Sequence, residues 1–395
     1  MGILSNTVSI CQFRVAGDIP PGDLFTWASE RLARQGFQSI EGSSAELSVG
    51  WVHLDDHRES DFAAPSAFWR DHYLAFTLRR DQRKLPAVLL KAYLQVAEHE
   101  HLAANPGLSR VPKQKREELR EAVRGALLAK TLPVPTAWDA VWDTRTGLVT
   151  FTALSQGVID LFEAQFKKTF EGLRLVAVHP YARGTEVVTD DLRPALEKAN
   201  QASSDAALDL IRSNRWLGAD FLLWLLYRTM EESSEYRVRR PGPAGENDPF
   251  VAYLNDRLVL QNAAENGVQK ITVAGPQDHF SEVRTALRNG KVITEATLYL
   301  EREENVWRLT LKGELFQFAS LKGPAVQIEK DNTVDQASER EAVFFERTHI
   351  LEEGLQLFDS LYAIFLADRL STGWVGEAAR IQEWLAGESE KAMER

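Results

Sequence analysis

The chain has 395 residues, of which 44% are hydrophobic and 26% are charged, and its formal net charge is −11 at pH 7. This length predicts two or three domains of a soluble globular protein. No apolar run of about 18 residues occurs and the first residues lack a secretory pattern, so we expect neither a membrane span nor a signal peptide. A single cysteine, Cys11, excludes an internal disulfide, and we expect it to be a small core residue in the reducing cytoplasm.

The first 78 residues alternate between strand and helix patterns. Residues 8–15 alternate in polarity as a strand does, and Asp23 precedes an apolar periodicity that stops at Gly36, which predicts a helix. From Gly50 the chain reads as a loop that continues to residue 66. Strand alternation returns at residues 73–79.

Two prolines mark the starts of two long helices. Pro86 precedes a helix to about residue 103, and Pro112 precedes a second helix to about residue 132, with a break at residues 105–107. Two helices joined by a short turn form an antiparallel arm. The apolar residues expected to face inward are Leu89, Leu90, Tyr93, Leu94 and Ala97 on the first helix and Leu119, Val123 and Leu127 on the second.

A β-hairpin from Trp138 to Ala153, with its turn at Arg145-Thr146-Gly147, is expected after the arm. The elements expected next are a helix at 155–170, a strand at 173–178, helices near 192–199, 205–211 and 221–230, and an exposed loop at 237–248. Those expected last are strands at 269–274, 291–300, 305–311 and 314–318, a helix at 280–287, a long helix at 339–370 and an acidic helical tail.

This mixture of helices and short strands predicts an α+β fold without internal repeats. The expected parts are the start of a central domain at 1–78, a helical arm and hairpin tip at 79–149, a return to the central domain at 150–182, an enlarged, mostly helical insert at 183–266, a C-terminal α/β domain at 267–370 and an acidic helical tail at 371–395.

The segment from Arg79 to Lys130 reverses the charge of the chain. It holds twelve Lys or Arg residues and six Asp or Glu residues, a balance of 12 − 6 = +6, which leaves −17 on everything else. A local basic surface on an acidic protein attracts polyanions at one place while the rest repels them. The sign contrast therefore favours a polyanion partner.

Four cations of the second arm helix, Lys113, Arg116, Arg120 and Arg124, recur at spacings of three and four and share one helical face. Cations at the start of a helix are opposed by its dipole, so an external anion is one explanation of this pattern. The alternative is a solvated helix whose Arg120 and Arg124 pair with Glu117 and Glu121.

Metal and nuclease chemistry find little support in the sequence. His53 and His57 flank two aspartates, but no cysteine or second histidine pair supports a closed site, so a polar loop is the preferred interpretation. None of the fourteen lysines follows an acid by two positions, and no Asp precedes a Glu by two, so familiar nuclease carboxylate patterns are missing. We expect no metal, no cofactor and no catalytic activity. Trp142 is expected in the core, whereas Trp138 lies nearer the expected tip.

The order of these features resembles the RdgC family of recombination-associated proteins. The resemblance covers about residues 1–180 and 268–368. It rests on Gly50-Trp51-Val52, Arg79-Arg80 with Lys84-Leu85-Pro86, the run Lys113 to Arg120, Leu132-Pro133, Trp142-Asp143-Thr144 with Gly147, the block from Gly290 to Thr294, and the terminal helix around 344–368.

The resemblance implies mixed sheets, a protruding helical arm with a β-hairpin tip, and a ring-shaped homodimer. Family members bind double-stranded DNA without sequence preference, associate with the nucleoid, limit the access of RecA to DNA, and are not established enzymes. The implied partners are duplex DNA and a second copy, and RecA is affected through competition for DNA. The residues expected to contact DNA are Arg79, Arg80, Arg83, Lys84, Lys91, Arg110, Lys113, Lys115, Arg116, Arg120, Arg124 and Gln277, and those expected at the tip or dimer contact are Pro135 and Trp138.

Departures from the family pattern reduce the basic charge elsewhere. The tip at residues 134–140 lacks basic residues, and of the family's basic C-terminal run Gln277 alone carries over. The arm, with Arg237, Arg239 and Arg240, is then expected to supply the charge. The alternative hypothesis is a protein-interaction module with weakened or lost DNA binding, whose residues 326–395, with fifteen acids and seven bases, bind a basic partner.

Overall fold

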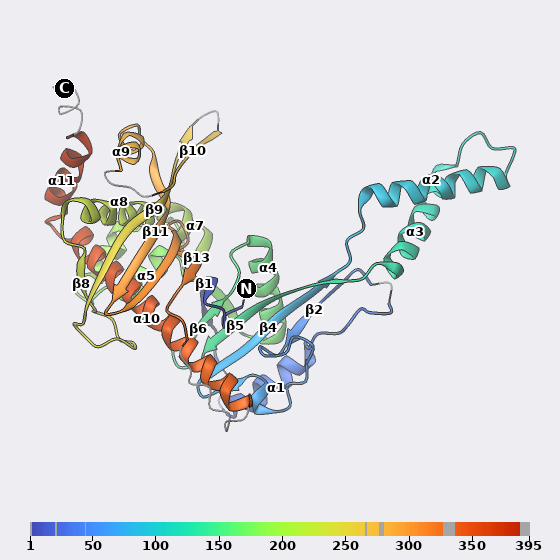
Figure 1. The fold of residues 1–395 in the computed structure, drawn as a ribbon, viewed down its shortest axis with the longest axis horizontal. Coiled ribbons are helices and arrows are strands. Elements are labelled where there is room, and N and C mark those ends of the chain that lie inside the picture. Colours follow the sequence, from blue (N-terminus) through green and yellow to red (C-terminus); the bar gives the residue numbers. More distant parts are fainter. Residues whose placement is uncertain are drawn as a thin grey trace. The chain divides into compact units, whose positions relative to one another are not determined.

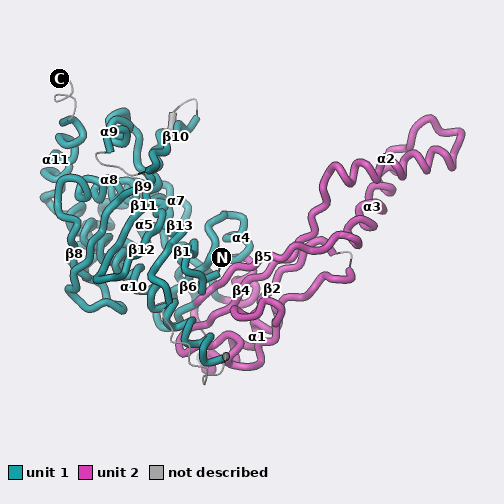
Figure 2. The backbone as a smooth tube through the Cα atoms, viewed as in Figure 1, with its two compact units in different colours: residues 1–17, 142–163, 173–395 teal, residues 18–141, 164–172 magenta. Residues whose placement is uncertain are grey.

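The computed structural model describes residues 2–19, 22–43, 45–264, 267–275, 280–326 and 336–387. It is a mixed α/β structure with a large antiparallel sheet (Figure 1). The chain forms two compact units, coloured separately in Figure 2: unit 1 comprises residues 1–17, 142–163 and 173–395, and unit 2 comprises residues 18–141 and 164–172.

The strands of unit 1 follow the order β10-β9-β11-β12-β13-β1-β6, with β7 paired to β1 and β8 paired to β9. All the pairings given for these strands are antiparallel. Their bounds are β1 Thr7–Ala16, β6 Leu148–Phe151, β7 Arg174–Ala177, β8 Glu235–Arg237, β9 Pro249–Ala264, β10 Gly267–Val273, β11 Val292–Arg302, β12 Asn305–Lys312 and β13 Gln317–Lys322.

Two long helices cover the apolar face of this sheet (Figure 1). Phe221 of α8 packs edge-on against Tyr362 and Phe365 of α10, with ring centroids 5.4 Å apart in both pairs. Such aromatic pairs stabilise a core beyond the area they bury. The helices are α4 Gln156–Thr169, α5 Pro180–Val187, α6 Arg193–Ala199, α7 Ala207–Ser213, α8 Arg215–Glu231, α9 Ser281–Arg288, α10 Gln336–Leu370 and α11 Trp374–Ala386; the last residues of α4 belong to unit 2.

The strands of unit 2 follow the order β5-β4-β2, with β3 paired to β4. Trp51 of β2 is fully buried and donates its indole N–H to the hydroxyl of Thr169 at 2.7 Å, while Trp27 of α1 stacks on Phe170. Asp23 caps α1 by accepting the N–H of Phe25. The bounds are α1 Leu24–Arg34, β2 Leu47–Val52, the short 3-10 helix Pro65–Ala67, β3 Trp69–Arg70, β4 Tyr73–Gln82, α2 Ala87–Ala104, α3 Lys113–Lys130 and β5 Val134–Asp143.

Helices α2 and α3, here called the helix pair, connect two neighbouring strands. The hydroxyl of Thr77 in β4 donates to Asp139 in β5, and the hydroxyl of Thr136 donates to the carbonyl of Arg80. Residue numbers therefore rise along β4 as they fall along β5, so the two strands run antiparallel. The helix pair lies beyond the ends of these strands within unit 2 (Figure 2).

Most helices expected from the sequence are confirmed to within a few residues, but α8 begins at Arg215 rather than at 221, α5 was not predicted, and the tail helix is described only to Ala386. Several strand predictions were wrong. Residues 47–52 form β2 where the sequence suggested that a loop begins at Gly50, and β13 starts at Gln317 rather than at 314. The stretch at 183–266, which was predicted to be mostly helical, also contains β8 and the whole of the sixteen-residue β9.

The hairpin turn predicted at Arg145-Thr146-Gly147 is confirmed, but the prediction that residues 134–140 form a tip was wrong. These residues are the first part of β5, and the turn of the hairpin falls at 144–147, where Gly147 has φ 72°. Trp138 lies within the strand and is half-buried, because the guanidinium of Arg80 covers its ring. Trp142 is fully buried, as predicted.

Candidate nucleic-acid interface

Arg79 and Arg80 are adjacent on β4 and stack on aromatic rings of two different elements. Arg79 lies 4.3 Å from the ring centre of Phe37, and Arg80 lies 5.0 Å from that of Trp138. Consecutive strand residues point to opposite faces, which separates the two guanidinium groups. Arg79 also makes two hydrogen bonds of 2.8 Å to Asp81, which raise its pKa, and a third to the carbonyl of His57. All three guanidinium nitrogens of Arg79 therefore already donate to acceptors within unit 2.

Arg83 is a structural residue, which corrects the expectation that it contacts a phosphate. Its side chain is 6% exposed and donates to four backbone carbonyls at 2.6 to 2.9 Å. The acceptors are the carbonyls of Ile40, Ser43, Ala45 and Thr131. Thr131 follows α3, so Arg83 holds the end of the helix pair against unit 2.

Three cations of α3 form ion pairs with acids other than those considered from the sequence. Arg116 pairs with Glu98 of α2 at 2.5 Å, Arg124 pairs with Glu46 at 2.5 Å, and Lys115 pairs with Glu118 at 2.9 Å. All three cations lie at the surface, where such a pair contributes about 1 kcal/mol or less. A phosphate group can therefore replace the carboxylate at small cost.

Six cations of the basic segment are exposed and form no ion pair within the described parts of the chain. They lie before, between and along the two helices: Lys84, Lys91, Arg110, Lys113, Arg120 and Lys130. Both helices begin after a proline and have no acid in the first turn. The helix pair thus gathers uncompensated positive charge, which suits a polyanion.

Helix α2 is apolar on two sides, which sequence analysis missed. Leu90, Leu94 and Ala97 are half-buried, as expected of an inward face. The adjoining side, about 100° around the helix, exposes Leu89, Tyr93 and Val96, the last to 57% of its area, and these recur at spacings of four and three. A further residue, Val88, is 81% exposed. A helix that is apolar on two sides normally has a second partner. The spacing of Leu89, Tyr93 and Val96 in the sequence could have indicated this second apolar side.

The other residues predicted to bind DNA or to form the tip lie outside the helix pair. Pro135 is exposed at the start of β5, and Trp138 stacks under Arg80. Gln277 lies outside the described residues. Arg237 lies on β8 of unit 1, where it donates to the carbonyl of Asn247.

The histidine loop that was weighed as a metal site is held by other contacts. His53 contacts the carbonyl of Asp61, whereas Asp56 accepts two hydrogen bonds from the Arg58 side chain, which lower the pKa of that carboxyl group. Asp55 pairs with Arg70. Across the described residues, no three His, Cys, Asp or Glu side chains are grouped as metal ligands.

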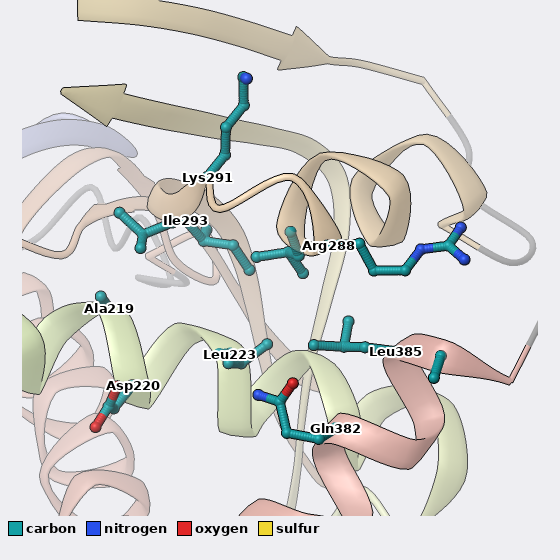
Figure 3. A pocket seen from close by; sticks show the side chains of 11 residues that line it. Ala219, Asp220, Leu223, Arg288, Lys291, Ile293, Gln382 and Leu385 are labelled. Carbon is teal, nitrogen blue, oxygen red and sulfur yellow. The ribbon is translucent and has the colours of Figure 1, made fainter. Parts of the chain in front are cut away.

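A pocket of about 270 Å³ in unit 1 lies between α8, α11 and the start of β11 (Figure 3). Lys291 and Arg288 extend away from it, and Leu223 and Leu385 form part of its apolar wall. The carboxylate at this pocket, that of Asp220, accepts a hydrogen bond of 2.9 Å from Arg369. The pocket therefore offers a small apolar surface rather than paired catalytic groups.

Comparison with known proteins assigns the family. None of the described helices is long and apolar enough to cross a membrane. A search of curated proteins finds no match to this chain. The sequence model of the family described as "Putative exonuclease, RdgC" matches residues 11–212, which is more than half of the chain and includes the whole helix pair. The chain therefore belongs to the recombination-associated RdgC family.

Proposed function

We propose that this protein binds double-stranded DNA without sequence preference, acts as a homodimer and limits the access of RecA to DNA. It has no catalytic role in this proposal, despite the word exonuclease in the family description. The observation that carries it is the group of six exposed cations without ion pairs, among the described residues, on and beside the helix pair. Lys and Arg contacts to phosphate position a protein on a duplex without reading its sequence.

The helix pair acts as a protruding arm in this proposal. Arg83 fixes its base, because its buried guanidinium donates to the carbonyl of Thr131 after α3 and to carbonyls of residues 40, 43 and 45. The exposed apolar side of α2 supplies the contact between two copies, and two arms that meet there enclose a duplex between them. Burial of Leu89, Tyr93 and Val96 against a second copy would provide the hydrophobic contribution that a stable dimer needs.

A salt titration of duplex binding tests the proposal. A triple variant, Lys84→Gln with Lys113→Gln and Arg120→Gln, removes three of the exposed cations. Each phosphate contact contributes about 0.9 to the slope of log K against log salt, so the slope should fall by about 2.7. The control triple, Lys167→Gln with Lys168→Gln and Lys198→Gln, removes the same charge from exposed positions outside the helix pair and should change the slope little.

Two results would reject DNA binding by this surface. One is the absence of duplex binding at low salt, which would favour the protein-interaction module. The other is an equal loss of slope in both triple variants, which would indicate attraction by net charge alone. Two duplexes of unrelated sequence should bind with the same affinity, because phosphate contacts carry no base information.

Competition with RecA is tested separately. Duplex saturated with the wild-type protein should be a poor partner in strand exchange by RecA, and the helix-pair triple variant should restore exchange. Duplex left at full length after incubation with Mg²⁺ or Mn²⁺ supports the absence of nuclease activity, whereas shortened duplex would contradict it.

A further inference from the structure

Strand β7 is an edge strand whose outer side has free backbone groups. It pairs with β1, and no other described strand pairs with it. The N–H of Val178 donates to the carbonyl of Gln12 at 2.9 Å, and hydrogen-bonding residues alternate along an antiparallel pair. Val176 therefore faces β1, whereas Leu175 and Ala177 direct their N–H groups outward. Within the described chain, no hydrogen bond engages either of these two N–H groups.

A cleft of about 700 Å³ follows this edge. Its lining includes the five consecutive residues from Arg174 to Val178. Successive side chains of a strand point to opposite faces, so a cleft lined by all five runs along the backbone itself. Ile159 of α4 and Ile211 of α7 line it as well. Its volume is in the range that binds ligands of several hundred daltons or a short peptide.

The cleft combines apolar surface and cations. Leu208 of α7 is 57% exposed beside it. Gln317 at the start of β13, which is 7% exposed, lines the cleft as well. Arg174 and Arg212 are exposed and form no ion pair in the described chain.

Three carboxylates also line the cleft. Glu314 pairs with Arg215 at 2.7 Å, and Glu163 and Asp205 line the same cleft as the two exposed arginines. Burial and the neighbouring Asp160 raise the pKa of Glu163. Arg174 and Arg212 form no ion pair in the described chain, so either arginine can pair with an acidic side chain of a bound segment.

We propose that this cleft binds an extended peptide segment of a partner protein, which adds a strand to β7. The segment carries apolar side chains that pack on Leu208 and Ile211 and an acidic side chain that pairs with Arg174 or Arg212. Its backbone accepts hydrogen bonds from Leu175 and Ala177, as in other cases of strand addition. This site lies in unit 1 and is independent of the proposed DNA surface on the helix pair.

Three fluorescent heptapeptides test the proposal on the full-length protein. The first alternates valine and aspartate, the second alternates valine and lysine, and the third is the aspartate peptide with alternate backbone nitrogens methylated. The aspartate peptide should bind saturably and protect the amides of Leu175 and Ala177 from hydrogen exchange. The lysine peptide and the methylated peptide should bind at least about tenfold more weakly, which corresponds to 1.4 kcal/mol.

A matched pair of variants isolates the backbone contact. Leu175→Pro removes an outward N–H and leaves the ladder to β1 intact, which edge strands tolerate. It should weaken the aspartate peptide about tenfold, whereas Leu175→Ala keeps the N–H and should change affinity by less than about threefold. If Leu175→Pro does not fold, the methylated peptide tests strand addition on the unaltered protein, because its N-methyl groups remove the peptide donors to the outward carbonyl of Leu175.

Several results would overturn the proposal. These are equal binding of the aspartate and lysine peptides, unchanged binding after methylation, and absence of binding by all three. Affinity for a small apolar probe alone, without protection of the β7 amides, would also overturn it and would indicate a small-molecule pocket. The triple variant of the helix pair should retain full peptide affinity, because its substitutions lie in unit 2.

Discussion

The Nε–H of Arg83 donates to the carbonyl of Thr131 at 2.7 Å and so joins the end of β4 to the residue that follows α3. Three other carbonyls accept hydrogen bonds from the same guanidinium. One buried side chain thereby fixes the chain where it enters and where it leaves the helix pair.

Replacement of Arg83 by methionine should destabilise unit 2. The change leaves four carbonyls without their donor, and buried unsatisfied groups cost about 1 to 3 kcal/mol each before water or relaxation compensates. We expect a loss of about 3 kcal/mol in the free energy of unfolding, measured by urea titration. Lys84→Met is the control, because Lys84 is exposed, and it should change stability by less than about 0.5 kcal/mol. Equal effects of the two variants would contradict the assigned roles.

Gly50 of β2 should not tolerate a side chain. A Cβ at this position would lie 2.4 Å from the Cα of Phe37, because the backbone of β2 contacts residues 36 and 37 directly. Gly50→Ala should therefore destabilise the protein by about 3 kcal/mol in urea unfolding. Gly125→Ala is the matched control: nothing lies within 4 Å of a Cβ there, and alanine should stabilise α3 by up to about 1 kcal/mol.

His179 should make stability depend on pH. Burial lowers its pKa from 6.5 to about 4, and no described group forms a hydrogen bond with its Nδ1. Between these values the unfolded chain binds a proton that the folded protein does not, so stability is full above pH 6.5 and falls as the pH drops toward 4. A shift of 2.5 units at 1.36 kcal/mol each sets an upper limit of about 3 kcal/mol.

The variant His179→Gln should lose this component. Unfolding free energies at pH 7 and pH 4.5 are compared for the wild type, for this variant and for His99→Gln, which alters an exposed residue of α2. The wild type and His99→Gln should lose similar amounts of stability on acidification, and His179→Gln should lose less. Parallel pH profiles for all three proteins would refute the assignment.

Self-association should depend on the exposed side of α2. Tyr93→Glu with Val96→Glu places charges on this apolar surface and should raise the dimer dissociation constant at least about tenfold, as measured by sedimentation velocity. Gln95→Glu adds one negative charge at an exposed neighbour outside that stripe and should have little effect. A dimer that persists unchanged in the double variant would place the contact elsewhere.

Local sequence signals predicted these helices well because a single residue marks where each helix begins. Asp23, Pro86 and Pro112 each precede a helix by one position. Strand β9 was missed because a local signal in its sequence is misleading. Its Asn255-Asp256-Arg257 stretch resembles a turn, and Asp256 indeed has φ 63°. The register to β11 shifts there, so these residues form a bulge within a continuing strand.

The candidate site was predictable in composition but not in detail. A run of cations shows that a segment is basic, yet nothing local distinguishes Arg83 from Lys84. The difference comes from carbonyls of residues 40, 43 and 45, about forty positions away, which surround one side chain and not the next. The exposed apolar side of α2 was likewise assigned inward because spacing alone does not show which of two apolar stripes meets α3.

The helix pair is, topologically, a long connection between two adjacent antiparallel strands. Loop-closure entropy grows slowly with length, by about 0.6 kcal/mol for each doubling. Insertion or deletion of whole helical turns between Arg83 and Thr131 therefore leaves the register of β4 and β5 unchanged. The span that the basic surface covers can lengthen or shorten in related proteins while the sheet that carries it stays the same.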